Sequence, residues 1–151
     1  MASLHYLTVQ DVLWINLQIT KKVQHFNYAR LEEATYYQYA YGESNTLFPQ
    51  AERFVSGFVR MHPFDAGNEA TAFVACLAFL LINGYVTSVS DERLSAWFKL
   101  ASGGAADAIK EIVEPDAEAH HGAIPDVRRT VRAILEKHAS ALRSMAEAAA
   151  A

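Results

Sequence analysis

Residues 62–84 read HPFDAGNEATAFVACLAFLLING, and this stretch decides the fold. From Asn68 to Asn83 it is apolar on nearly every side, and Gly84 is placed to end the helix in a left-handed conformation. A helix without a polar face is stable only where neighbours cover it all round, as at the centre of a bundle. The apolar run is shorter than the ~20 residues of a membrane span. The sequence therefore predicts a buried central helix in a soluble protein.

Helical patterns precede this stretch. Thr8 and Asp11 form a capping box, and apolar residues follow them at helical spacing. A second helix is expected from Tyr28 to about Tyr39. Pro49 suits the first position of a third helix. The apolar stripe of that third helix consists of Ala51, Phe54, Val55, Phe58 and Met61.

Helical patterns also follow the central stretch. Ser90 can cap a fifth helix that ends near Ser102. A shorter helix is expected over residues 105–113, then a loop, and then a long last helix over about 125–148. The chain has no internal repeat and no alternating pattern long enough for a sheet. We predict an all-α bundle forming one domain over residues 1–151, with its core over about 7–113.

The composition narrows the class of protein. Of the 151 residues, 52% are hydrophobic and 20% are charged, which is typical of a globular protein. The net charge of −4 and the lack of a Lys/Arg run argue against nucleic acid or an anionic membrane as the main partner. Cys76 is the single cysteine, so no disulfide can form within the chain. With no visible signal peptide, these features predict a cytoplasmic location.

Taken one by one, the loop residues have structural explanations. His62 can cap the last carbonyls of the preceding helix, and Phe64 can join the core. Asn68 can act as an N-cap, and Glu69 is a favourable charge in a first turn. The functional alternative is that the helix N-terminus binds an anion while His62 accepts a proton.

Four residues stand at the offsets of a known signature loop: His62, Phe64, Gly67 and Asn68. The loop resembles that of the Fic/Doc (filamentation / death-on-curing) family, which reads roughly His-x-Phe-x-Asp/Glu-Gly/Ala-Asn-Gly/Lys-Arg. The order and spacing of the helices from about Leu7 to Lys99 are also similar to those of Doc-like proteins. The resemblance implies a helical bundle around one central helix, with a short flap before the loop. It also implies transfer of AMP or phosphate from a nucleotide to a protein hydroxyl, with Mg²⁺ and ATP as cofactors.

The resemblance assigns a role to each matching residue. His62 would be the base that deprotonates the target hydroxyl, and Phe64 would pin the loop into the core. Gly67 and Asn68 would hold the phosphates. The flap, which would hold a target segment by strand addition, would include three residues: Tyr39, Tyr41 and Gly42. The alternative for this tyrosine-rich segment is an aromatic lid over the core.

Three positions depart from the family pattern: Ala66, Glu69 and Ala70. They replace, in that order, the acidic Mg²⁺ ligand, a glycine or lysine, and an arginine. A second arginine, found in the nucleotide-transferring branch, would fall on Phe73. Asp65 is the remaining candidate metal ligand, alone or together with Glu69. Three arginines on neighbouring helices could supply the lost charge: Arg53, Arg60 and Arg93.

The departures weigh against catalysis. Each lost charge contact typically costs a transition state ~3 kcal/mol, and Glu69 would repel a phosphate. We therefore favour a Doc-like protein of toxin–antitoxin type, weak or inactive as a transferase, that needs no cofactor and binds a target protein or an antitoxin-like partner. The alternative is an active Fic/Doc transferase that uses Mg²⁺ and ATP. A third hypothesis makes the loop purely structural and places the function on the last helix, as in homo-oligomerisation.

Overall fold

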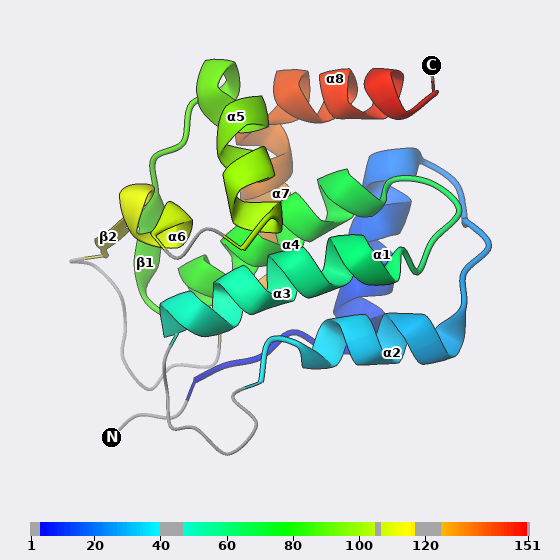
Figure 1. Ribbon diagram of the computed structural model, residues 1–151, viewed down its shortest axis with the longest axis horizontal. Coiled ribbons are helices and arrows are strands. Elements are labelled where there is room, and N and C mark those ends of the chain that lie inside the picture. The colour runs from blue at the N-terminus through cyan, green and yellow to red at the C-terminus, as the bar shows by residue number, and fades with distance from the viewer. Residues whose placement is uncertain (1–3, 40–46, 105–106, 117–124, 151) are drawn as a thin grey trace.

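The computed structural model describes residues 4–39, 47–104, 107–116 and 125–150. Its helices and strands are, in chain order, α1 (Val9–Thr20), α2 (Tyr28–Tyr36), α3 (Leu47–Met61), α4 (Asn68–Ile82), β1 (Tyr85–Thr87), α5 (Asp91–Ser102), α6 (Ala108–Glu111), β2 (Val113–Pro115), α7 (Val127–Lys137) and α8 (Ala139–Ala150). Helices dominate this part of the chain, so the predicted all-α class is confirmed (Figure 1). Within the described ranges, no helix combines the length and the apolar character needed to cross a membrane.

Helix α4 lies at the centre of the molecule, with α1, α3 and α7 packed around it (Figure 1). Of its 15 residues, only Glu69 and Leu81 are not buried. Phe54 and Phe58 of α3 are fully buried in the same core. Full burial of a large apolar side chain contributes ~1.5–3 kcal/mol, so α4 and the helices around it supply much of the stability. The predicted central apolar helix is confirmed.

Helix α2 ends at Tyr36, earlier than the predicted end near Tyr39. The side chain of Gln38 is fully buried and pairs with the backbone of Leu7. Its amide nitrogen donates to the Leu7 carbonyl at 2.7 Å, and its amide oxygen accepts from the Leu7 N–H at 2.7 Å. This long-range pair ties the chain after α2 to the segment before α1, in place of a further helical turn.

The starts of α1 and α3 differ in how well the sequence predicts them. The capping box before α1 is present: Thr8 Oγ1 accepts from the Asp11 N–H, and the Asp11 carboxylate accepts from the Thr8 N–H. Helix α3 begins at Leu47 rather than at Pro49. Pro49 still lies in the first turn, where a missing N–H removes no helical hydrogen bond.

A short sheet follows α4, and no sequence pattern predicts it. Gly84 leaves the helix at φ +92°, as expected of a left-handed terminator. Strand β1 then pairs with β2 in antiparallel register, with Tyr85 opposite Pro115. Each strand has three residues, too few for an alternating pattern. The helix predicted over 105–113 is accordingly shorter, because Val113 belongs to β2.

The last helix is not continuous, so the prediction of one long helix over about 125–148 is wrong. Helix α7 ends at Lys137 and α8 begins at Ala139, with His138 between them at φ −111° and ψ 21°. The His138 side chain is buried, and its Nδ1 lies 2.8 Å from Oδ1 of Asp91 at the start of α5. Contact with two other helices thus holds the chain at the break.

Candidate functional site

The signature loop, residues 62–67, joins α3 to α4. His62 ends α3, because its N–H donates to the Phe58 carbonyl at 3.1 Å while its φ is +49°. A non-glycine residue occupies this left-handed region only where its surroundings enforce it. Pro63 and Phe64 turn inward and are buried, whereas His62 is exposed. Within the described part of the chain, the His62 imidazole has no hydrogen-bond partner, so it is available to accept a proton.

Phe64 anchors the loop in the hydrophobic core. Its side chain is 2% exposed, and its ring lies 5.9 Å from that of Phe26 and 6.5 Å from that of Phe58. The backbone of Phe64 also forms an antiparallel bridge with Phe26. In this bridge the Asn27 N–H donates to the Pro63 carbonyl, and the Asp65 N–H donates to the His25 carbonyl, both at 3.0 Å. The segment between α1 and α2 therefore holds the outer edge of the loop.

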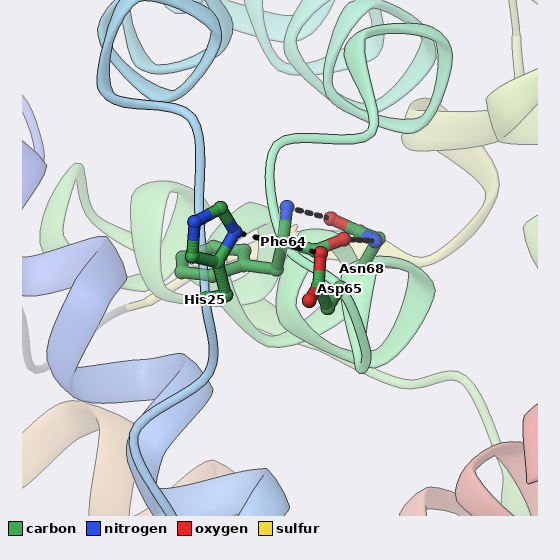
Figure 2. A network of polar contacts seen from close by, with 4 residues as sticks. All are labelled: His25, Phe64, Asp65 and Asn68. Atoms are coloured by element: carbon green, nitrogen blue, oxygen red, sulfur yellow. Dashed lines mark hydrogen bonds and ion pairs between the residues drawn. The ribbon is translucent and has the colours of Figure 1, made fainter.

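Asn68 holds the inner edge of the loop. Its Oδ1 accepts from the Phe64 N–H at 2.9 Å, and its Nδ2 donates to the Phe64 carbonyl at 2.7 Å (Figure 2). The side chain is 6% exposed, and both ends of its amide are engaged by the loop backbone. Gly67, rather than Asn68, is the N-cap of α4, so the structural reading of Asn68 as an N-cap is wrong.

Asn16 of α1 completes the support of the loop, and sequence reasoning missed it. Its Nδ2 lies 3.0 Å from the Ala66 carbonyl and 3.1 Å from Oγ1 of Thr71. The side chain is 1% exposed, and a buried amide is stable only where it is bonded. The available signal was its position between Ile15 and Ile19, on the apolar face of α1. Such a polar residue among core positions indicates a buried partner.

In and just after the loop, backbone carbonyls are hydrogen-bonded, whereas a run of backbone N–H groups is not. The carbonyls of Pro63, Phe64, Ala66 and Gly67 each accept a hydrogen bond. The N–H groups from Gly67 to Ala70, at the start of α4, have no acceptor among the described residues. Unpaired N–H groups and the positive end of the helix dipole favour an anion. The backbone therefore has the form of an anion cradle.

Comparison with protein families agrees with this geometry. A model of the Fic/DOC family matches residues 6–80, a range that runs from just before α1 through the loop and most of α4. The chain belongs to the Fic/DOC family. A search of curated proteins and a search of solved structures each found no match.

The arginine positions of the Fic/DOC pattern lie in the core of this protein. Ala70 is 3% exposed and Phe73 is fully buried. The Phe73 ring meets Trp97 of α5 edge-on at 6.0 Å and His138 edge-on at 5.2 Å. An arginine at either position would place a charge inside the core. The departures at these two positions therefore lie in the core and not on the surface.

The remaining loop positions are open to solvent but carry no suitable cation or metal site. Ala66 and Glu69 are exposed, and Glu69 lies in the first turn of α4. Asp65 is 3.8 Å from His25, with both side chains mostly exposed, so this pair contributes little stability. Among the described residues, no group of three or more His, Cys, Asp or Glu side chains could hold a metal ion. Asp65 therefore belongs to no such group within the described part of the chain.

Two of the arginines proposed to supply charge contact a different segment. Nε of Arg53 donates to the Tyr37 carbonyl at 3.3 Å, and Nη2 donates to the Tyr39 carbonyl. The guanidinium of Arg60 lies over the Tyr37 ring, 5.7 Å from its centre. Gly57 makes room for this arrangement, since a Cβ there would lie 2.5 Å from the Tyr37 ring. Arg93 is exposed on α5.

The predicted flap is only partly described. Tyr41 and Gly42 lie outside the described residues. The Tyr39 ring lies 4.3 Å from that of Tyr6, which in turn stacks on Phe79 of α4 at 5.9 Å. These contacts fit the aromatic-lid alternative for Tyr39, because its ring covers the end of the core.

Proposed function

We propose that this Fic/DOC protein is of the Doc-like, toxin–antitoxin type, has lost nucleotide-dependent transfer, and acts in the cytoplasm by binding another protein. One observation carries the proposal. At the phosphate end of the loop stands an exposed carboxylate, Glu69, while the two arginine positions are occupied by buried Ala70 and Phe73. The single cysteine, Cys76, is buried and unpaired, which fits a reducing compartment.

The backbone of the site fits a phosphate oxygen, but its side chains fit neither the charge of the phosphates nor the Mg²⁺ ion of a metal-bound nucleotide. The N–H groups of Gly67 to Ala70 suit a phosphate oxygen. However, two like charges ~4 Å apart repel by about 4 kcal/mol at an effective dielectric constant near 20, so Glu69 opposes a phosphate there. Ala66 has no carboxylate for the Mg²⁺ ion. The residues present do not fit Mg·ATP, and no catalytic step is assigned to it.

Two of the neighbouring arginines are already engaged elsewhere. Arg53 and Arg60 already contact Tyr37, and moving either one would break those contacts. Losing several preorganised charge contacts, each ~3 kcal/mol, reduces a transfer rate by many orders of magnitude. The loop therefore keeps its shape as a scaffold, and the surface around it is left for protein binding.

The test is nucleotide binding measured by calorimetry and by thermal melting. We expect millimolar Mg·ATP to leave the melting temperature of the native protein unchanged, because only a bound ligand stabilises the folded state. The double variant Ala66→Asp, Glu69→Lys changes two exposed positions and should gain measurable Mg·ATP binding. Glu33→Lys, which repeats the charge change of Glu69→Lys on the exposed face of α2, is the control and should not gain such binding. Tight Mg·ATP binding by the native protein would overturn the proposal.

The second candidate function is an active Fic/DOC transferase that moves AMP or phosphate to a protein hydroxyl. It is favoured by the exposed imidazole of His62, on the loop that leads into α4: within the described residues neither this imidazole nor the first N–H groups of α4 have a hydrogen-bond partner. Incubation with labelled ATP and Mg²⁺ would detect label on a protein. Labelling that disappears in His62→Ala would establish this function in place of the first.

A further inference from the structure

A groove lies beside the start of α4, between α5 and α8. Its volume is about 770 Å³, and residues of all three helices line it. In Figure 1, α8 crosses above α4 and meets the upper part of α5. Glu69, in the first turn of α4, is one of the lining residues, so the groove adjoins the signature loop.

The groove exists because the last helix is broken at His138. The pair formed by His138 Nδ1 and Asp91 Oδ1, at 2.8 Å, ties the break to the start of α5. From this point α8 runs away from α7, and Ala141 and Met145 come to line the groove opposite α5. A continuous helix would place these residues elsewhere.

Apolar side chains from two helices form the floor of the groove. Leu94 and Phe98 come from α5, and Ala141 and Met145 come from α8. Helix α5 lines the groove from Asp91 to Ser102, about 16 Å at ~1.5 Å per residue. A channel of this length between two helices accommodates about three turns of a third helix, which is a recurring mode of peptide recognition.

The charges on the rim are mainly negative. Glu69, Asp91 and Glu92 contribute carboxylates, whereas Lys99 is the one cationic residue among the described residues that line the groove. Complementary charge steers a partner to a site and discriminates against partners of the wrong sign. Glu69, which opposes a phosphate, thus favours a cationic partner.

We propose that this groove binds an amphipathic helical segment of a partner protein, with apolar residues on its buried face and lysine or arginine residues against the acidic rim. This inference rests on the proposed protein-binding function and deepens it by naming the site and the chemistry of the partner. Aromatic and aliphatic side chains of the segment fill the floor, and its cations pair with Glu69 and Glu92. The bound segment lies directly beside the signature loop.

The test uses a synthetic amphipathic peptide of about 12 residues, with leucines on one face and lysines on the other. Its binding to the full chain is measured by fluorescence anisotropy. Ser144 of α8 also lines the groove. We expect saturable binding that weakens at least tenfold in Glu92→Lys, which reverses a rim charge, and in Ser144→Trp, which obstructs the groove. The matched controls Glu136→Lys and Ala133→Trp, at exposed positions of α7 outside the groove, should bind as the native protein does.

Each contrary result has a distinct meaning. Equal binding to native protein and groove variants, or equal binding of a peptide with glutamates in place of lysines, would overturn the proposal. Spermidine that binds and competes with equal affinity would show that the groove takes small cations instead. Dimerisation abolished by Ser144→Trp would assign the groove to a second copy of the chain. A Mg·ATP titration of the same samples tests the proposed function independently. Nucleotide binding would contradict the proposed loss of transfer, whereas a failure of peptide binding would contradict only the proposed groove.

Discussion

Gly67 determines both the backbone conformation of the loop and its close packing against α1. Its φ of +79° lies in the region that favours glycine. A Cβ at this position would lie 2.7 Å from the Thr20 methyl and 3.1 Å from Nδ2 of Asn16. The same amide of Asn16 holds the Ala66 carbonyl, so any shift would disturb the loop. Gly67 is therefore required twice, once by its backbone conformation and once by the close approach of α1.

We predict that Gly67→Ala lowers the free energy of unfolding by roughly 2–4 kcal/mol, because strain and steric overlap add. Gly104→Ala is the matched control: Gly104 has φ +84°, but no atom of the described residues lies within 4 Å of its Cβ position. It should lose only roughly 1 kcal/mol, from backbone strain alone. Urea denaturation of both variants measures the difference, and equal losses would contradict the tight approach of α1.

At the scale of elements, α3 and α6 bring two carboxylates near each other. Glu52 lies on α3, and Asp107 is the N-cap of α6. Burial, and to a smaller extent the charge of Asp107, raise the pKa of the Glu52 carboxyl. A carboxyl with a raised pKa in the folded state favours folding most when it is protonated. Its contribution to stability is therefore present at acid pH and is lost as the pH rises through its unfolded and then its folded pKa.

We predict that Glu52→Gln, which stays neutral, becomes more stable than the native protein as the pH rises from about 4 to about 7. The gain at neutral pH should be below about 1 kcal/mol, because the side chain is only partly buried. Asp107→Asn should give a smaller gain, since repulsion is the lesser cause. Thermal melting across this pH range measures both, and a native advantage at pH 7 would contradict the raised pKa.

At the scale of the whole molecule, His138 is a point at which four helices meet: α4, α5, α7 and α8. It separates α7 from α8, pairs with Asp91 of α5, and packs edge-on against Phe73 of α4. Its Nε2 is buried and has no hydrogen-bond partner among the described residues. The His138 ring thus contacts Phe73 of α4, which stands at the family's second arginine position, and it also ties together α5 and α8, the helices on either side of the groove.

We predict that His138→Leu lowers the free energy of unfolding by about 1–3 kcal/mol, because it leaves Asp91 without its buried partner. Asp91→Asn should lose less, since the asparagine oxygen can still accept from Nδ1. The leucine variant should also weaken binding of the cationic peptide, because α8 is no longer tied to α5. Chemical denaturation and anisotropy measure the two effects, and full native stability in His138→Leu would refute the connecting role.

The sequence by itself determined the features that depend on neighbouring residues. The capping box at Thr8, the apolar pattern of α4, and the left-handed terminator Gly84 are local, so one chain segment suffices to predict them. The family was equally accessible, because its signature is a continuous run of residues from His62 onward. The departures at Ala66, Glu69 and Ala70 could also be read directly.

Only the tertiary structure decided what depends on contacts between distant segments. That Asn16 holds the Ala66 carbonyl, that Phe26 bridges Phe64, and that β1 pairs with β2 each join segments far apart in sequence. The break at His138 also has no local signal, since a partner on α5 holds that side chain in the core. The apolar pattern of α4 predicts that its residues are buried, but it does not specify which helices surround them, because those helices come from distant parts of the chain. For that reason the packing of Phe73 against Trp97 and His138 had to come from the fold.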